Sequence, residues 1–483
     1  MFKVARYLCL ATFLFLLSCI KSGKRTGDDL AFKFYDSVES AHASILDKNN
    51  LSNLLDQGTY LKFNSRINLK ESSNAYLLAD QNVDDWEKSS FQIVKKNFLD
   101  FIEYLFTNLN HDIQYELKPH EITFLNFNLA INHALMGRYD LSAVEVRKIA
   151  KREEAIERIN KKIYETVKEQ ENFNADLGDE ARAIYKIEEI GDYPIEDFKS
   201  EKVRNMQNSY QNSSANYFSG FIFEAEGDLS LAAPAYKKAI ELNPENSLYK
   251  SSLRNLDKKN NKINNNKTEI LVIIENGIAP QLSNKKFRFG VPTTRGFRGT
   301  NIFLPIIKDN LTFNNDNISI LANDAKIPLE TTTEVDIILK RYLRDSMPKY
   351  LSAASTRALI QIASKEAFSH SARKLRKYDG GATQLLGTAL IEKIMSTSEP
   401  NVRTWNSLPN NIQMARFNLD KEKDNILIIS LGSKSETIKL NTSKNYQLIS
   451  IRVVGDEKYF RIENNNINEG NEYFNAIIKA SKN

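Results

Sequence analysis

The segment 216–244 constrains the fold more than any other part of this chain, because small, aromatic and proline residues recur in it at fixed offsets. These positions are Gly220, Phe223, Gly227, Ala232, Tyr236, Ala239 and Pro244. Gly220 and Ala232 let two helices approach closely, Gly227 permits a turn, and the proline ends the second helix. The offsets are those of a tetratricopeptide (TPR) repeat, a helix-turn-helix of about 34 residues. They predict a close antiparallel helical hairpin.

Two degraded copies of this pattern lie upstream. The first copy has Ala130, Gly137, Ser142, Val146 and Ile149 at corresponding offsets, and the second spans 54–80 with Gly58, Ser73 and Ala79. From Asp28 to about Leu256 apolar residues recur at spacings of three and four, which is typical of amphipathic helices. Repeat units cannot bury their apolar faces alone, so we expect the intervening helices to complete the stack. The sequence therefore predicts an all-α, TPR-like helical repeat domain over 31–256.

The residue pattern changes after a polar run of Asn and Lys at 257–267, which we interpret as a linker. Runs of β-branched and aliphatic residues follow it and predict strands. The expected strands are 269–274, 286–291, 301–307, 318–322, 425–431, 437–440, 447–454 and 458–462, and the expected helices are 334–346, 352–378 and 383–397. Strands, then helices, then strands predict an α+β domain over 268–483 with a mostly antiparallel sheet.

A short apolar segment opens the chain and ends at Cys19. Lys3 and Arg6 precede an almost wholly apolar run, 8–17, which is too short to span a bilayer stably. Ser18 then supplies the small residue that precedes a signal cleavage site. This order resembles the signal and lipobox of bacterial lipoproteins, in which the cysteine is lipidated and becomes the first mature residue.

The resemblance implies a signal peptide at 1–18, lipidation of Cys19 and a lipidated tether at 19–30. No acidic residue occurs in 20–22, which in the enteric sorting scheme implies an outer-membrane protein facing the periplasm. Past the signal no run of about twenty apolar residues occurs, so the lipid is the only expected membrane contact. A plain signal peptide or an uncleaved anchor, with Cys19 incidental, remains the alternative.

Charge and cysteine content argue against a nucleic-acid-binding protein and against a disulfide-stabilised protein. The formal charge of +5 falls to +3 once Lys3 and Arg6 leave with the signal, and the charges are interspersed. A nucleic-acid surface that follows phosphates is therefore not expected. Because Cys19 is then the sole cysteine and carries lipid, we expect no internal disulfide.

Residues for hydrolytic or metal chemistry are sparse. The chain has five scattered histidines, His42, His111, His120, His133 and His370. None lies in a His-Glu-x-x-His frame, so we predict no catalytic residues, no metal and no cofactor. The alternative is that His111 and His120 meet across a loop, each beside a carboxylate.

Two further segments each allow two interpretations. Arg288, Arg295 and Arg298 alternate with glycines and form either an anion-binding loop or a β-connection with solvated arginines. Trp405, near Arg403, is either an exposed stacking platform or a loop anchor packed into the core.

Four segments, in this order, resemble a family of uncharacterised TPR-containing lipoproteins from Gram-negative bacterial envelopes. They are 143–148 (AVEVRK), 216–220 (NYFSG), 275–280 (ENGIAP) and 403–409 (RTWNSLP). Together with the lipobox they are spread over nearly the whole length of the chain. The resemblance implies the two-part architecture but no activity. The sequence departs from the family pattern at Ser213, Ser214 and Asn401.

Two classes of function follow. The first is a non-catalytic scaffold or assembly factor, because TPR stacks bind peptides or helices of partner proteins in a concave groove. The expected partners are other envelope proteins, and the residues expected to face the groove are Tyr217, Phe221, Glu224, Asn126 and His133. The alternative is a protein that binds or modifies peptidoglycan through its α+β domain, with Asp336, Glu366 or Asp379 as candidate carboxylates.

Overall fold

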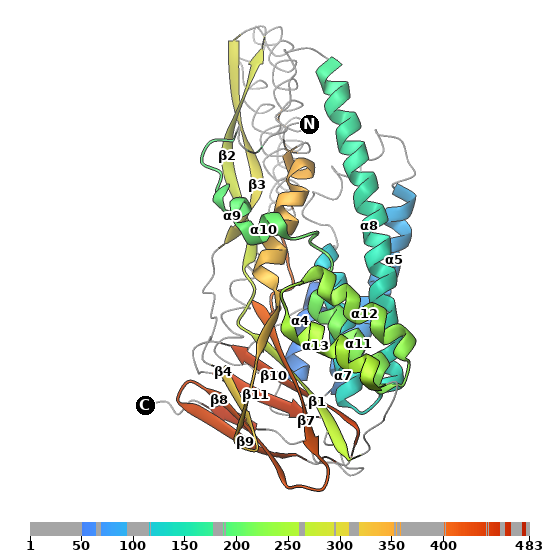
Figure 1. The fold of residues 1–483 in the computed structure, drawn as a ribbon. Helices are drawn as coiled ribbons and strands as arrows, with labels where there is room; N and C mark the ends of the chain where they lie inside the picture. The colour runs from blue at the N-terminus through green and yellow to red at the C-terminus, as the bar shows by residue number, and fades with distance from the viewer. Residues whose placement is uncertain are drawn as a thin grey trace, which may run out of the picture.

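The computed structural model describes most of the chain between the first helix and the last strand. The described residues are 51–63, 69–93, 115, 117–176, 187, 190–259, 266–293, 296–308, 318–351, 354, 358, 400, 402–440, 442, 444–454, 459–464 and 476–479. The N-terminal half is helical and the C-terminal part consists mostly of antiparallel strands, which confirms the predicted α+β arrangement (Figure 1). Cys19 and the predicted helices 352–378 and 383–397 lie almost wholly outside the described residues.

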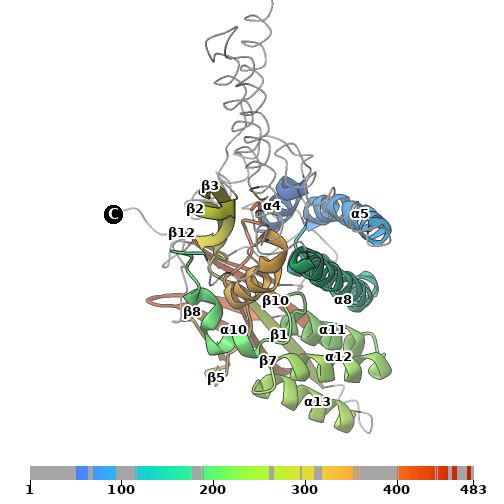
Figure 2. The same cartoon turned by 90° about the horizontal axis from the view of Figure 1, so that it is seen from above.

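The helices form three hairpins at the three predicted repeat segments. The hairpins are α4 (Leu51–Lys62) with α5 (Leu69–Ile93), α7 (Pro119–Leu135) with α8 (Tyr139–Asp176), and α11 (Ser213–Ala225) with α12 (Leu229–Leu242), which α13 (Ser247–Lys259) follows. Two short helices, α9 (Glu196–Lys199) and α10 (Glu201–Asn205), precede the third hairpin. Seen from above, α5, α8, α12 and α13 follow one another along one side of the molecule (Figure 2).

Glycine permits the close helix contact in two of the hairpins. A Cβ atom on Gly220 would overlap the ring of Tyr236, and one on Gly58 would overlap the ring of Tyr76 in the same way. Both rings are fully buried. Gly227 has φ +80° in the turn between α11 and α12, a conformation that side chains disfavour. The spacing of small and aromatic residues thus has the packing role that the sequence predicts.

The strands form three sheets. Their bounds are β1 (Lys267–Asn276), β2 (Gln281–Thr293), β3 (Gly296–Lys308), β4 (Ile318–Ala322), β5 (Ala325–Ile327), β6 (Glu330–Glu334), β7 (Asn411–Asp420), β8 (Asn425–Leu431), β9 (Lys434–Leu440), β10 (Tyr446–Val454), β11 (Tyr459–Asn464) and β12 (Ala476–Lys479). The largest sheet has the order β12-β11-β10-β1-β7-β6 and a second has the order β5-β4-β8-β9. Every pairing is antiparallel except that of β1 with β10.

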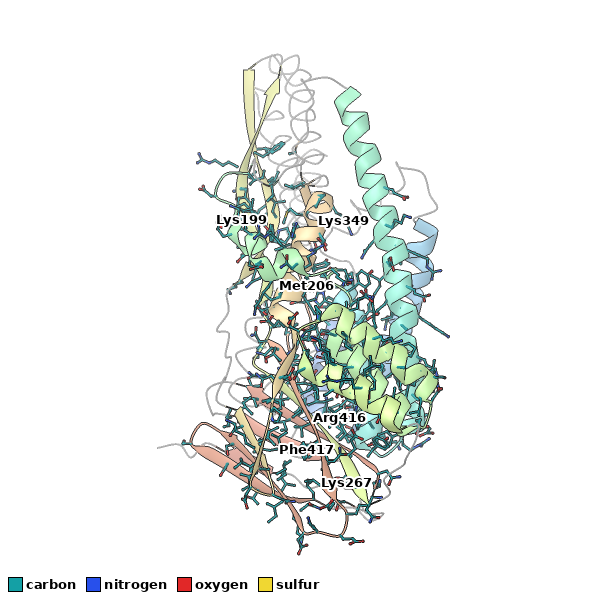
Figure 3. The ribbon with its side chains drawn as sticks, viewed as in Figure 1. Lys199, Met206, Lys267, Lys349, Arg416 and Phe417 are labelled. Atoms are coloured by element: carbon teal, nitrogen blue, oxygen red, sulfur yellow. The ribbon has the colours of Figure 1, made fainter. Side chains whose placement is uncertain are left out.

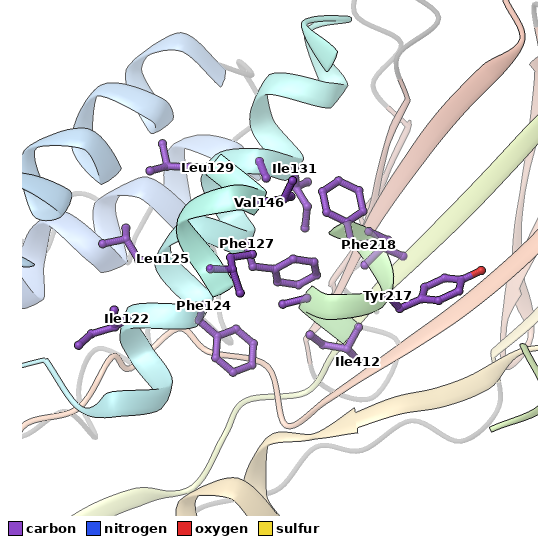
Figure 4. Packing of buried hydrophobic residues seen from close by; sticks show 14 of the residues in the cluster. Ile122, Phe124, Leu125, Phe127, Leu129, Ile131, Val146, Tyr217, Phe218 and Ile412 are labelled. Atoms are coloured by element: carbon purple, nitrogen blue, oxygen red, sulfur yellow. The ribbon is translucent and has the colours of Figure 1, made fainter. Parts of the chain in front are cut away.

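The six-stranded sheet is the middle of three layers. Leu271 and Ile273 of β1 point toward the helices and belong to the same buried cluster as Phe127 and Phe218. Those two rings meet edge to face, 5.6 Å apart, between α7 and α11 (Figure 4). The alternate residues of β1, such as Val272, pack against the four-stranded sheet. The helices therefore share their hydrophobic core with the sheet.

A long two-stranded hairpin, β2 with β3, extends away from the two larger sheets (Figure 1). Phe287 and Phe289 lie on its buried face, in a cluster with Phe198 of α9 and with Leu339 and Leu343. The last two belong to a helix over residues 335–351, close to the predicted 334–346. Strands β6 and β7 were not predicted, because polar residues interrupt their apolar pattern.

Replacement of Gly220 by alanine tests the hairpin packing. The added methyl carbon would lie 2.4 Å from the Tyr236 ring, so we expect the upper part of the about 1–3 kcal/mol that overpacking costs, more than the ~1 kcal/mol that alanine gains in helix propensity. We expect a lower melting temperature for Gly220→Ala. Gly191→Ala is the control, because no atom lies within 4 Å of that position. Equal melting temperatures for the two variants would contradict the packing.

Candidate functional site

The five residues predicted to face a binding groove are all buried. Tyr217, Phe221 and Asn126 have no exposed surface, and Glu224 and His133 are 4% and 8% exposed. They therefore do not line an open groove in this structure, and that expectation is corrected. The physical reason is that the six-stranded sheet and neighbouring helices cover the inner faces of the hairpins.

Arg416 of β7 forms the centre of the contact between the third hairpin and the sheet. Its Nη2 atom lies 2.8 Å from Glu224 Oε2 of α11, its Nη1 donates to Tyr236 Oη at 2.7 Å, and its Nε pairs with Glu269 of β1. The guanidinium also lies over the Phe221 ring, 5.2 Å from its centroid. Figure 3 labels Arg416 where the hairpin meets the sheet. One buried cation thus joins two carboxylates from different layers.

The strand register explains this geometry. Arg416 pairs with Leu271, and Glu269 lies two residues earlier on the same face of β1. Both charged side chains therefore point toward the helices, whereas the neighbouring Phe417 lies on the opposite face. Tyr446 of β10 completes the contact by donating to Glu224 Oε1 at 3.3 Å.

A second buried charge cluster lies at the other end of β1. Glu275 is 3.0 Å from Lys62 Nζ of α4 and 3.4 Å from Arg452 Nη1 of β10. Arg452 also donates to the carbonyl oxygens of Gly277 and Ser407, at 2.9 and 3.0 Å. Lys62 and Arg452 are fully buried. The first hairpin is therefore joined to the sheet by the same kind of contact as the third.

The loop 404–409 is held by two carboxylates from the helices. Asp56 of α4 accepts from the backbone N–H and hydroxyl of Ser407, at 2.9 and 2.7 Å, and from Asn406 Nδ2 at 3.0 Å. Glu121 of α7 accepts from the Trp405 N–H at 2.7 Å. Trp405 is 2% exposed, so the structure supports the loop-anchor interpretation. We call this contact the carboxylate clamp.

Burial sets the protonation behaviour of these acids. It raises the pKa of Asp56 to about 7, against the opposing hydrogen bonds from Ser407 and Asn406. Burial also raises the pKa of Glu121. Glu153 of α8, which accepts from Asn216, has its pKa raised to about 7 for the same reason. Asp56 and Glu121 are desolvated at the contact with the loop 404–409, and Glu153 is desolvated between helices.

Asn126 and His133 lie between helices. Asn126 Nδ2 donates to Glu145 Oε2 at 2.8 Å, and Arg152 joins the same group by pairing with Asp80 of α5. Burial lowers the pKa of His133, which favours the neutral imidazole. Both residues therefore belong to packing between α5, α7 and α8.

The remaining predicted residues that the structure describes lie on separate elements. Arg288 is exposed on β2. The register pairs Arg298 of β3 with Val291 of β2, so both arginines belong to a regular hairpin. Arg295 lies outside the described residues. Asp336 is half-buried, 3.6 Å from Lys340. Glu366 and Asp379 lie outside the described residues. His120 is buried, and burial lowers its pKa to about 3.

The buried ion pairs and hydrogen bonds described above join the helices to the sheet and to the loop 404–409. In the described part of the chain, no group of three His, Cys, Asp or Glu side chains is placed to hold a metal. Among the same residues, none of the helices has the length and hydropathy of a transmembrane span. No protein-family model matches this chain, and no curated protein sequence matches it.

Sequence reasoning missed the charges that join the layers. Glu269 and Glu275 flank the apolar run 270–274, and Arg452 interrupts the apolar strand 447–454. A charged residue within a buried strand needs a partner, so these interruptions were a usable signal. The identity of each partner depended on the folded register.

Arg416→Met tests the first charge cluster. The substitution leaves Glu224 and Glu269 buried without their cation, which destabilises a protein by about 3–5 kcal/mol. We expect that loss in urea unfolding. Arg138→Met is the control, because its pair with Asp140 is more than half exposed and such pairs contribute about 0–1 kcal/mol. Equal losses in both variants would contradict a cohesive role for Arg416.

The carboxylate clamp predicts a pH dependence of stability. Asp56 has a folded pKa of about 7 against an ordinary 3.8, so the folded state binds more protons within that window. The stability that protonated Asp56 contributes to the folded state is fully present below pH 3.8 and is lost as the pH rises through about 7. The free energy of unfolding should therefore fall across this window, and Asp56→Asn should reduce the fall. An unchanged slope in urea titrations would show that Asp56 is not the responsible group.

Proposed function

We propose that this chain is a lipid-anchored, non-catalytic protein of the bacterial cell envelope that binds other envelope proteins through TPR-like repeats. The anchor is Cys19, and the protein lies at the outer membrane facing the periplasm. The signal-like segment that ends at Cys19 supports the location. Three helical hairpins at the repeat segments support the scaffold role. The proposal requires no cofactor.

The distribution of exposed apolar side chains carries this proposal. Five large apolar side chains are exposed among the described residues, and four of them lie on the second helices of the three hairpins. They are Leu77 and Leu78 of α5, Val144 of α8 and Leu231 of α12, whereas the fifth is Ile426 of β8. Exposed apolar side chains that cluster on one surface indicate a contact with another protein. We call these four residues the outer row.

Ion pairs show that the helices of the outer row are neighbours. Lys148 of α8 lies 3.0 Å from Asp80 of α5. Arg147 of α8 lies 3.8 Å from Asp228, the residue that caps α12. Val144 lies one helical turn from both cations. The outer row therefore crosses adjacent helices, with charged groups beside the apolar ones, as in protein interfaces with a polar rim.

Other parts of the chain cover the inner faces of the hairpins. The sheet covers them through Arg416, Glu275 and the carboxylate clamp, so a partner protein has the outer surface available. The proposed partner is an envelope protein with apolar side chains that match the outer row.

Substitution of the outer row tests the proposal in living cells. Leu78→Ser with Val144→Ser and Leu231→Ser should abolish crosslinking to the captured envelope proteins, because the substitutions remove the apolar area that the partner would bury. Each substitution should change the free energy of unfolding by no more than about 0.5 kcal/mol, since all three side chains are exposed. Ile426→Ser is the matched control and should leave capture intact. Fatty-acid labelling of Cys19 in the same cells checks the anchor. Undiminished capture by the triple variant would contradict the proposed surface.

A further inference from the structure

The hairpin of β2 and β3 concentrates positive charge. Residues 281–308 contain six basic residues and no Asp or Glu, in a chain with a formal charge of only +5. The six are Lys285, Lys286, Arg288, Arg295, Arg298 and Lys308. We call residues 281–308 the basic hairpin.

The two faces of the basic hairpin differ. Phe287 and Phe289 are buried against the 335–351 helix and α9. The alternate positions Lys286 and Arg288 are exposed, and Asn301, opposite Arg288, is exposed as well. Neither Lys286 nor Arg288 forms an ion pair with another described residue. This face therefore presents cations whose charge the described part of the protein does not neutralise.

We propose that the exposed face of the basic hairpin contacts the anionic headgroups of a phospholipid bilayer. Each lysine or arginine near an anionic membrane surface contributes a roughly fivefold factor to binding. Toward the far end of the hairpin, the register pairs Pro292 with Phe297, and both positions lie on the same face as Lys286 and Arg288. Cations beside apolar residues match the boundary between headgroups and acyl chains. An acidic protein would match the charge but not this apolar content.

Such a contact orients the protein on the membrane. The four-stranded sheet lies at the opposite end of the molecule from the far end of the basic hairpin (Figure 1). A bilayer bound by the hairpin would therefore leave β8 and β9 away from the lipid. The inference rests on the proposed lipid anchor, because the anchor brings the hairpin to a bilayer.

A fluorescent probe on the hairpin tests this contact with the full-length chain as isolated from the cells that produce it. Asn301→Cys places a dye opposite Arg288, and Ser435→Cys places the same dye on exposed β9. We expect the dye at 301 to shift to an apolar environment on vesicles of phosphatidylcholine with phosphatidylglycerol, but not on phosphatidylcholine alone. About 1 M salt should reverse the shift, since the Debye length is then about 3 Å. The dye at 435 should not respond.

Charge variants complete the test. Lys286→Gln with Arg288→Gln should lower the bound-to-free ratio of the hairpin probe by at least about tenfold, from two cations at roughly fivefold each. Lys423→Gln with Lys439→Gln removes the same charge from exposed positions near β8 and β9 and should have little effect. No response to anionic vesicles, or equal effects of the two double variants, would overturn the inference. A probe that responds to polyglutamate but not to vesicles would also overturn it, in favour of an acidic protein.

The proposed function is tested separately by the flotation of the same chain with phosphatidylcholine vesicles. Flotation depends on the acyl chains and not on the hairpin charge. Flotation without a probe shift rejects the hairpin contact and retains the anchor. A probe shift without flotation on neutral vesicles rejects the anchor and retains the hairpin contact.

Discussion

Buried charge at the boundary between the helices and the six-stranded sheet is the constraint on which the rest of the structure depends. Arg416 lies between Glu224 of the third hairpin and Glu269 of β1. A buried charge without its partner costs several kcal/mol, so loss of either layer would leave an unpaired charged side chain in the other. Glu275 and Lys62 impose the same condition on the first hairpin. The helices and the sheet are therefore expected to fold as one unit.

This constraint decides which surface is free for other molecules. In an isolated stack of helical hairpins the concave face is the usual binding surface. Here the chain's own sheet and the loop 404–409 occupy it, and Asp56 and Glu121 hold that loop through backbone N–H groups. The proposed binding surfaces accordingly lie outside the core, on the outer row and on the basic hairpin. Both consist of exposed side chains on helices or strands.

The hairpins were predictable because their signals are local. Gly220 and Tyr236 are sixteen positions apart, and one helix-turn-helix brings them together. The charge clusters were not predictable in the same way, since Glu269 and Arg416 are 147 positions apart and meet only through strand register. Strand β7 was missed because Arg416 and its polar neighbours break the apolar alternation that marks a strand.

The groove prediction was wrong for a related reason. A repeat pattern shows which helix face is concave, but it does not show what covers that face. From the sequence alone, Glu224 could equally be an exposed carboxylate in a groove, because its partner Arg416 is far away in the chain. Its position directly after the apolar run 221–223 was a sign that it could require a buried partner.

Coincidence of two unfolding transitions tests most directly whether the helices and sheet are one unit. The chain has two tryptophans, and Trp86→Phe leaves Trp405 as the reporter of the loop held by the carboxylate clamp. Helix content is followed by circular dichroism at about 222 nm in the same urea titration. If the helices and the sheet unfold as one unit, the two signals change together with one midpoint. Loss of the Trp405 signal at a lower urea concentration than loss of the helices would contradict it.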